Sequence, residues 1–320
     1  MNTLFWGSSQ LSIPFLSTLL NNKFIKLSAV VTLSDKPQGR GMKILPTPVR
    51  RLAQEHGIKT IMSDVIASET FYKNIAELEP ELSVVVSYGK IIPNKIIKLH
   101  KIGMINIHFS LLPKYRGAAP IQWALINGES KTGVTIFWID EGLDTGDIFV
   151  QKETKITIDD NYFTLSERLI KLGTNALEDV VRQILDGKII RISQKGEASY
   201  APLINKQIAK IDWDKPAISI HNLVRALVQW PKAYSILSVK NKGSIKVKIL
   251  QTQIDTETVG NLGTNLVPGT VVKISNHYIS VLCGENSFIK ILKLQPENKN
   301  VLDAQQFICG YKVQQYDKFS

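Results

Sequence analysis

The sequence predicts an α/β protein with a mostly parallel, doubly wound sheet in its first part and a small β-barrel at its C-terminus. Short apolar runs alternate with amphipathic stretches through the first part, as in consecutive βαβ units. Further on, β-branched runs separated by turn residues recur, which is typical of a small barrel or sandwich. A chain of 320 residues is long enough for two domains. We expect them to cover residues 1–204 and 205–320.

The first domain is predicted to consist of short apolar strands with helices between them. The predicted strands cover residues 3–6, 24–32, 82–87, 103–107 and 134–139. Five apolar side chains from Leu11 to Leu20 fall on one helical face, for which Ser8 or Ser9 is a suitable N-cap. A longer helix is predicted over residues 163–185, because apolar residues recur there at helical intervals.

The second domain is rich in short strands and in basic residues. Its predicted strands cover residues 245–250, 270–274, 278–283 and 287–294. Residues 206–320 carry a net charge of +7, whereas residues 1–205 carry +4. A basic domain suggests a polyanionic partner because phosphate neutralisation releases counterions, although the same charge also serves solubility.

The composition excludes several kinds of protein. Cys283 and Cys309 are too few for a disulfide framework or a thiolate zinc cluster, and they fit a reducing cytoplasm. The five histidines lack the spacing of metal ligands, so we expect no metal. No basic segment precedes an apolar stretch at the N-terminus, and no apolar run approaches the roughly 20 residues of a membrane span. We therefore expect a cytoplasmic protein that does not associate with membranes.

Glycine motifs that hold phosphate groups are absent from the predicted sheet. Gly7-Ser8-Ser9 follows the first strand without the GxGxxG pattern, and no GxxxxGK[ST] motif occurs. A doubly wound fold does not by itself imply a nucleotide. We therefore reject functions that depend on NAD or ATP.

The densest polar signal is Asn106-Ile107-His108 at the carboxyl end of a predicted buried strand. In open α/β sheets ligands bind outside these strand ends, and residues two apart in a strand point the same way. Asp144 lies in a loop after another buried strand, where it can orient and charge an imidazole. An amide donor beside a titratable group suits a tetrahedral intermediate. Each residue alone is commonly structural, but the combination predicts acyl transfer.

Three stretches of the chain resemble the 10-formyltetrahydrofolate-dependent formyltransferases. They are Asn106-x-His108, Ser110-Leu-Leu-Pro113-x-Tyr-Arg-Gly117 and Asp144-Thr-Gly-Asp147. The resemblance covers the whole chain and implies a Rossmann-like catalytic domain followed by an OB-like domain. It implies that Asn106 polarises the formyl carbonyl and binds the oxyanion. It also implies that His108, helped by Asp144, supports that charge and carries a proton from the attacking amine to the folate nitrogen.

The same resemblance implies 10-formyltetrahydrofolate as the formyl donor and indicates where it binds. The expected contacts come from the loop after Asn-x-His, from an earlier strand-to-helix turn, and from the loop before Asp144. These residues are Ser110, Leu111, Leu112, Pro113, Tyr88, Gly89, Ile91 and Asp140. Without the resemblance, the earlier turn would be an ordinary connection. Backbone groups can supply much of the pterin recognition there.

The three catalytic candidates do not specify the acceptor amine, because related formyltransferases act on different amines. A long loop over residues 35–48 combines glycines with cations that can follow a phosphate backbone. It resembles the loop by which tRNA-acting members of the family enter the acceptor stem. Small barrels also bind nucleic acid along basic faces. The expected tRNA contacts are Lys36, Arg40, Lys43, Arg50, Lys206, Lys246 and Lys248.

The resemblance therefore implies a monomeric enzyme that formylates the α-amino group of methionyl initiator tRNA. One alternative is a formyltransferase that uses the same three residues on an amino sugar nucleotide or glycinamide ribonucleotide. Another is a tRNA-binding protein without turnover. The cationic loop argues against the first alternative, and the presence of all three catalytic side chains argues against the second.

Overall fold

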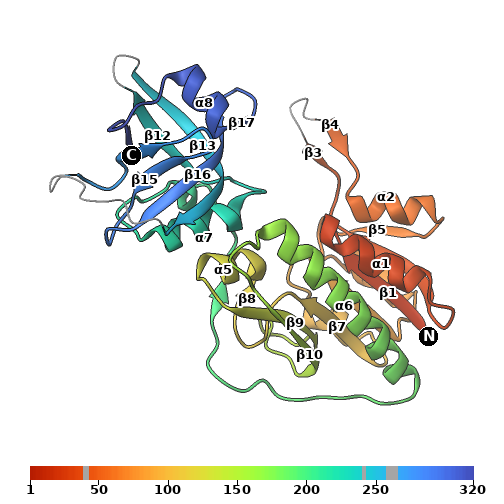
Figure 1. The fold of residues 1–320 in the computed structure, drawn as a ribbon. Helices are drawn as coiled ribbons and strands as arrows, with labels where there is room; N and C mark the ends of the chain where they lie inside the picture. The colour runs from red at the N-terminus through yellow and green to blue at the C-terminus, as the bar shows by residue number, and fades with distance from the viewer. Residues whose placement is uncertain (39–42, 240–242, 257–265) are drawn as a thin grey trace. The chain divides into compact units, whose positions relative to one another are not determined.

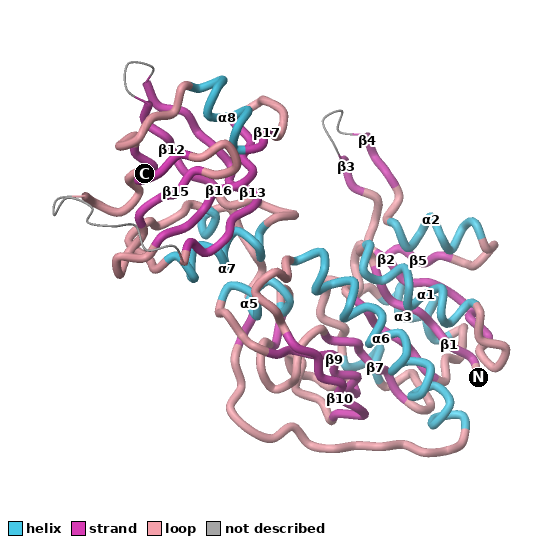
Figure 2. Tube along the Cα trace, in the orientation of Figure 1, coloured by secondary structure: helices cyan, strands magenta, loops and turns pink. Residues whose placement is uncertain are grey.

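The computed structural model describes residues 1–38, 43–239, 243–256 and 266–320 of a chain that divides into two compact units. The first unit comprises Met1–Pro120, Lys131–Lys155 and Ser166–Pro202. The second comprises Ile121–Ser130, Ile156–Leu165 and Leu203–Ser320. Figures 1 and 2 show an α/β unit and a unit rich in β-strands. Two short segments from the first part of the chain thus belong to the second unit, which the sequence did not predict.

The first unit is organised around a seven-stranded sheet (Figure 1). In spatial order its strands are β10 (Ile148–Lys155), β9 (Lys131–Trp138), β7 (Gly103–His108), β6 (Leu82–Val86), β1 (Asn2–Gly7), β2 (Lys26–Thr32) and β5 (Thr60–Met62). The five strands from β7 to β5 are parallel, whereas β9 and β10 are antiparallel additions. The prediction of a mostly parallel sheet is therefore confirmed. Strand order reverses between β1 and β6, and loops at such a switch point open a crevice at the carboxyl edge.

In the part of the chain that the structure describes, five helices accompany this sheet. They are α1 (Ile13–Leu20), α2 (Pro48–Glu55), α3 (Glu69–Ala76), α4 (Asn94–Ile97) and α6 (Tyr162–Leu185), the last of which begins within the second unit. Strand β6 is buried along its whole length, as expected for a parallel strand covered on both faces. The predicted helices over residues 11–20 and 163–185 are thereby confirmed, with shifted ends.

The N-cap predicted for the first helix was wrong. Ser9 precedes a short 3₁₀ turn, η1 (Gln10–Ser12), and Ser12 occupies the N-cap position of α1. The Ser12 hydroxyl makes no capping bond, because it donates instead to the carbonyl of Val86 at 2.7 Å. This bond attaches the start of α1 to the end of β6, at the switch point of the sheet.

Two small strand pairs lie outside the main sheet. Strands β3 (Lys36–Gln38) and β4 (Lys43–Leu45) are antiparallel and flank residues 39–42, which lie outside the described residues. Strands β8 (Arg116–Gly117) and β11 (Tyr200–Ala201) pair in parallel. The second pair brings together segments more than eighty residues apart in sequence.

The second unit is a nearly closed antiparallel β-barrel, so the predicted barrel is confirmed. Its strands are β14 (Val271–Ile274), β15 (Ile279–Leu282), β16 (Phe288–Pro296), β13 (Gly243–Asp255), β12 (Tyr234–Val239) and β18 (Lys318–Phe319), with β17 (Leu302–Asp303) beside β16. The helices are α5 (Pro120–Ile126), α7 (Ala217–Leu227) and α8 (Ala304–Tyr311), and a 3₁₀ turn, η2, covers Gln207–Ala209.

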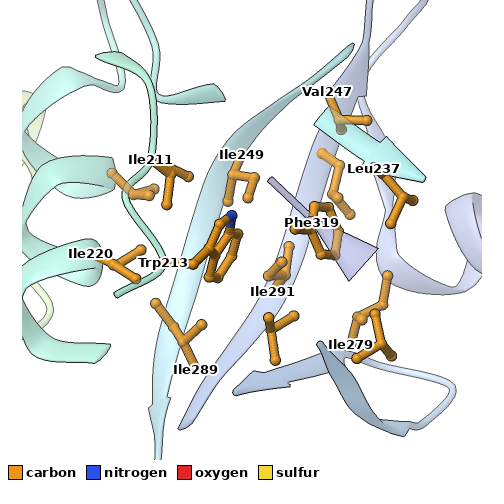
Figure 3. Packing of buried hydrophobic residues seen from close by; sticks show 14 of the residues in the cluster. Ile211, Trp213, Ile220, Leu237, Val247, Ile249, Ile279, Ile289, Ile291 and Phe319 are labelled. Atoms are coloured by element: carbon orange, nitrogen blue, oxygen red, sulfur yellow. The ribbon is translucent and has the colours of Figure 1, made fainter. Parts of the chain in front are cut away.

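Apolar side chains from several of these strands fill the barrel (Figure 3). Trp213 and Phe319 lie with ring centroids 5.4 Å apart, and the Trp213 indole N–H donates to the Ser235 hydroxyl at 2.9 Å. Along β13, Val247 and Ile249 are buried between more exposed residues, as expected for a strand with one face in a core. The barrel interior is therefore lined mainly by apolar side chains, and the indole N–H of Trp213 has a hydrogen-bond partner.

Helix α7 holds the segment Ile156–Leu165 within the second unit. The Arg225 guanidinium donates to the carbonyls of Thr157 and Asp160, at 2.7 and 3.0 Å. His221 lies 3.0 Å from the carbonyl of Ile158 through Nε2 and 2.9 Å from the Thr252 hydroxyl through Nδ1. Burial lowers the pKa of both Arg225 and His221. These buried hydrogen bonds explain why a segment distant in sequence joins this unit.

Candidate active site

Asn106 and His108 lie at the carboxyl end of strand β7, which pairs with β6 close to the switch point of the sheet. Asn106 pairs with Val85 of β6 on one side and with Phe137 of β9 on the other. Its side chain is partly exposed, and within the described residues no protein group hydrogen-bonds its amide. The amide is therefore free to donate to a ligand at the carboxyl edge of the sheet.

His108 is buried, and its two ring nitrogens have different partners. Nε2 lies 2.8 Å from the backbone carbonyl of Tyr115. A carbonyl only accepts, so Nε2 carries a proton, and in the neutral ring Nδ1 is the nitrogen with a free lone pair. Nδ1 lies 3.6 Å from Oδ2 of Asp144, which is an ion-pair distance and longer than a hydrogen bond. The structure thus brings His108 and Asp144 together, in a geometry that stabilises the imidazolium.

Asp144 is held in a conformation that few non-glycine residues adopt, with φ at +53°. Its Oδ2 accepts a hydrogen bond from the backbone N–H of Gly117 at 2.7 Å. Close packing fixes the same loop at Gly146, where a Cβ atom would lie 1.7 Å from the carbonyl oxygen of Trp138. The carboxylate is therefore positioned by its surroundings and not by its own backbone preference.

Asp140, a predicted folate contact, shapes the loop that carries Asp144. Its Oδ1 accepts from the backbone N–H of Gly142 at 3.0 Å and from the Thr145 hydroxyl at 2.6 Å. The carboxylate is exposed, so one face remains open to solvent. Its contact with folate stays a prediction.

The loop from Ser110 to Pro113 is fixed by side chains of the two antiparallel strands. Thr135 donates to the carbonyl of Ser110 at 2.7 Å and accepts from the N–H of Leu112 at 3.1 Å. The Gln151 amide donates to the carbonyl of Leu112 at 2.7 Å. Sequence reasoning missed both supporting residues, although Thr135 is the one polar residue in the otherwise apolar run of residues 134–139. Leu111, between them, packs against Gly133, where an added Cβ would lie 2.5 Å from its side chain.

The turn after β6 contains Tyr88, Gly89 and Ile91, three further predicted folate contacts. Gly89 has a φ of +89°, which suits glycine. Tyr88 is buried, and burial raises the pKa of its hydroxyl to about 12 against a weak opposing effect of Ser63. Ile91 is 76% exposed. The turn therefore presents backbone groups and an apolar side chain at the carboxyl edge, which are the elements of pterin recognition.

The predicted tRNA contacts have differing surroundings. Arg40 lies outside the described residues, and Lys36 and Lys43 belong to the strands that flank it. Arg50 is partly buried and forms an ion pair with Asp35, at the base of the same loop. In the second unit, the three predicted lysines Lys206, Lys246 and Lys248 are at least partly exposed. None of these contacts with RNA is tested by the structure, and they stay predictions.

The described residues hold no cluster of three His, Cys, Asp or Glu side chains that could bind a metal ion. No helix in the described ranges is both long and apolar enough to cross a bilayer.

The polar edge can perform acyl transfer to an amine. The Asn106 amide, which has no hydrogen-bond partner among the described residues, can donate to an oxyanion, and the Nδ1 lone pair of the buried His108 ring can accept a proton. The Asp144 carboxylate lies 3.6 Å from Nδ1 of that ring, close enough to interact electrostatically with a positive charge that forms there during a reaction. An arrangement of this kind supports attack of an amine on a carbonyl carbon.

Comparison with known proteins agrees with this chemistry. A family model for formyl transferases matches residues 5–181, and a model for the formyl transferase C-terminal domain matches residues 203–312. Methionyl-tRNA formyltransferase from Thermodesulfovibrio yellowstonii is 41% identical, over 99% of this chain and 98% of the relative. The enzyme of that name from Caldanaerobacter subterraneus is 40% identical, over 98% of both chains.

Solved structures with a similar fold include a formyltransferase and a protein with bound tetrahydrofolic acid. An N-formyltransferase from Helicobacter canadensis, in complex with folinic acid and dTDP-3-aminofucose, has a TM-score of 0.67 at 22% identity. The match covers 92% of this chain and 98% of that one. HypX from Aquifex aeolicus, in complex with tetrahydrofolic acid, has a TM-score of 0.61 at 15% identity, over 99% of this chain and half of that one. At these identities the matches establish the fold. Together with the relatives that match along the full length, they show that the chain belongs to the formyltransferase family, among the methionyl-tRNA formyltransferases.

Proposed function

We propose that this chain transfers the formyl group of 10-formyltetrahydrofolate to the α-amino group of methionyl initiator tRNA. The observation that carries the proposal is the His108–Asp144 pair beside the Asn106 amide, which has no hydrogen-bond partner among the described residues, in a chain similar over its full length to methionyl-tRNA formyltransferases. The reaction forms a bond between the methionine nitrogen and the formyl carbon. It breaks the bond between that carbon and the folate nitrogen, which receives the proton that the amine loses.

Each catalytic residue has a role that follows from its surroundings. Asn106 donates to the formyl oxygen, because its amide has no protein partner among the described residues. His108 accepts the amine proton on Nδ1, because its Nε2 proton is held by the carbonyl of Tyr115. Asp144 stabilises the imidazolium until the proton passes to the leaving nitrogen.

The carboxyl edge of the first unit offers apolar side chains for the faces of a pterin ring and polar groups for its edges. Ile91 and Leu143 are 76% and 50% exposed, and they lie in the two loops proposed to contact the pterin. The two loops are joined by a hydrogen bond from the Asn94 amide to the Glu141 carboxylate. Ser110, Leu112 and the rest of the loop up to Pro113 are fixed by Thr135 and Gln151, so they can present backbone groups in a constant position.

We assign residues 1–204 to catalysis and residues 205–320 to tRNA binding. Lys246 and Lys248 alternate with buried residues along β13, which directs both lysines away from the apolar core. These lysines, and separately the cations that the sequence carries in residues 35–48, are proposed to contact the phosphate backbone. We further propose that the protein acts as a monomer in the cytoplasm, where its two unpaired cysteines remain reduced.

A formylation assay tests this function. The protein is incubated with 10-formyltetrahydrofolate and methionyl initiator tRNA, an amino sugar nucleotide or glycinamide ribonucleotide, and formyl incorporation is measured. We expect product on the tRNA alone. Product only on one of the small amines would refute the tRNA assignment, and tight tRNA binding without turnover would show a binding protein.

The Asn106→Ala variant tests the role of the amide. Loss of one oxyanion donor typically lowers kcat by about 100- to 1,000-fold. We expect the melting temperature and the affinity for tRNA to stay unchanged, since the amide bonds to no other group in the described chain. A variant with normal kcat would show that the oxyanion is stabilised elsewhere.

A further inference from the structure

We infer that Gln194 is a positioning residue that holds Asp144 beside His108. This inference rests on the proposed function. Gln194 lies fifty residues after Asp144, in an extended segment that precedes β11. Its neighbours on both sides in the chain are exposed, whereas Gln194 itself is partly buried. A glutamine that turns inward from an exposed segment requires polar partners there.

The partners of Gln194 are the backbone of the Asp144 loop. Its amide Nε2 donates to the carbonyl of Asp144 at 2.8 Å and to the carbonyl of Gly146 at 2.9 Å. Both donor hydrogens of the amide are thereby used in one short loop. The two bonds fix the backbone on either side of Thr145, and they act directly on the residue that has the left-handed φ of +53°.

The acceptor end of Gln194 is fixed as well. Arg116 donates from Nη2 to Oε1 of Gln194 at 2.6 Å, and this orients the amide so that Nε2 faces the loop. The next residue, Gly117, donates its N–H to the Asp144 carboxylate. The preceding residue, Tyr115, accepts from His108. Residues 115–117 thus contact both catalytic side chains, and Gln194 connects the same three residues to the Asp144 backbone.

The segment around Gln194 makes further hydrogen bonds, on one side to residues 147–148 and on the other to residues 115–116. Ile192 exchanges two backbone hydrogen bonds with Ile148, at 2.7 and 3.0 Å, and Ser193 donates to the Asp147 side chain at 3.1 Å. Ser199 accepts from the N–H of Arg116 through its carbonyl and from the N–H of Tyr115 through its hydroxyl. Gln194 therefore sits in a segment that is anchored at both ends, which gives it a fixed position from which to hold Asp144.

The hydrogen bonds from Gln194 matter because, without them, the backbone of Asp144 could move to a more common conformation with negative φ. A non-glycine residue with positive φ persists only where neighbouring contacts impose it. Relaxation would move the carboxylate from its 3.6 Å separation from His108 Nδ1. Misplacement of a catalytic group by about 1 Å can cost about 100-fold in rate. Gln194 touches neither reacting group, so its effect passes entirely through Asp144.

The test uses the full-length protein and steady-state formylation of methionyl-tRNA at saturating 10-formyltetrahydrofolate. Gln194→Met keeps the length of the side chain but removes its donors and its acceptor. Gln194→Glu keeps an acceptor for Arg116 but replaces the donor with an oxygen that faces two carbonyls. Gln54→Met is the matched control, since Gln54 is exposed on α2. We expect kcat to fall about 10- to 100-fold in both Gln194 variants, with the KM for tRNA within about threefold, and no change in the control.

A double-mutant cycle separates positioning from a general structural role. On an Asp144→Asn background, where the carboxylate is already lost, Gln194→Met should lower kcat by less than about threefold. A full, additive loss on that background would overturn the inference, because Gln194 would then act elsewhere. Normal kcat in either Gln194 variant would also overturn it, and Gln194→Glu decides the matter if Gln194→Met does not fold. Absence of formyl transfer by the unmodified protein would instead refute the proposed function itself.

Discussion

Each unit of this molecule buries a histidine that donates to a backbone carbonyl, yet the two rings have different surroundings. In the first unit, His108 bonds to Tyr115 and its second nitrogen faces the carboxylate of Asp144. In the second unit, His221 bonds to Ile158 and its second nitrogen meets the Thr252 hydroxyl at 2.9 Å. The carboxylate can stabilise a charged ring, whereas burial lowers the pKa of His221 and keeps it neutral. The group that faces Nδ1, a carboxylate for His108 and a hydroxyl for His221, therefore distinguishes the catalytic histidine from the structural one.

The two units also differ in the polarity of the regions compared, which are the barrel core and the carboxyl edge of the sheet. The barrel core is apolar, and its stability depends on the area that side chains such as Trp213 remove from water. The carboxyl edge of the first unit contains the Asn106 amide, for which the described part of the chain supplies no hydrogen-bond partner, and Asp144, a non-glycine residue with positive φ. Such groups stabilise a transition state at some cost to the folded state. Changes in the barrel should therefore alter stability, and changes at the edge should alter turnover.

The largest expected effect comes from exchanging each histidine for glutamine. His108→Gln should lower kcat by about 100- to 10,000-fold, the usual contribution of a general acid-base group. His221→Gln should change the stability of the second unit while kcat at saturating tRNA stays within a few-fold. Steady-state formylation and thermal unfolding of both variants are the measurements. Equal losses of kcat in the two variants would contradict the assignment of His108 as catalytic and His221 as structural.

The next largest effect is expected from the barrel core. Trp213→Ala removes a buried aromatic side chain, which typically costs about 3–5 kcal/mol of unfolding free energy. Trp230→Ala is the matched control, because that indole is 49% exposed and its loss should cost less than about 1 kcal/mol. Chemical denaturation of the two variants measures the difference. Similar costs would indicate that the barrel core does not depend on Trp213.

A third prediction concerns the pH dependence of stability and a buried histidine of the first unit, His100. His100 contacts the Ser83 hydroxyl at 2.7 Å, and Ser83 accepts from the indole N–H of Trp6. Burial lowers the pKa of His100 from 6.5 to about 4. Below pH 6.5 the unfolded chain therefore binds a proton that the folded chain does not, so stability falls as the pH drops from 6.5 to 4. The loss from this group should be about 3 kcal/mol.

The His100→Gln variant measures this contribution. Its unfolding free energy should fall less steeply than that of the unmodified protein between pH 6.5 and 4. His56→Gln is a suitable control, since His56 is exposed. Parallel pH profiles for the unmodified protein and His100→Gln would contradict the expected role of burial.

The smallest expected effect lies on the outer face of the barrel. Lys246→Gln removes one cation from β13 without touching the core. If this face follows the phosphate backbone, tRNA affinity should fall slightly and the dependence of log K on log salt should weaken by about one unit. kcat at saturating tRNA should not change. Lys23→Gln, at an exposed position of the first unit, is the control, and an unchanged salt dependence for Lys246→Gln would place the RNA on another face.

Several features of the molecule were determined by the sequence alone. Apolar runs and helical periodicity identified the sheet, the long helix α6 and the barrel strands, because burial of one face requires a regular local pattern. The sequence also predicted that Asn106 and His108 lie on the same face at one strand end, since residues two apart in a strand share a face. The nearby Asp144 was identified from its loop after a buried strand, and the structure brings it to His108.

Other features were decided only by the tertiary structure. The tautomer of His108 depends on the carbonyl of Tyr115, and the position of Asp144 depends on Gly117 and Gln194. The segment Ile156–Leu165 joins the second unit through buried bonds to α7. These contacts join irregular segments, which have no periodicity that could reveal their partners. Their hydrogen bonds are satisfied only where the folded chain brings donors and acceptors together, so no local pattern could predict them.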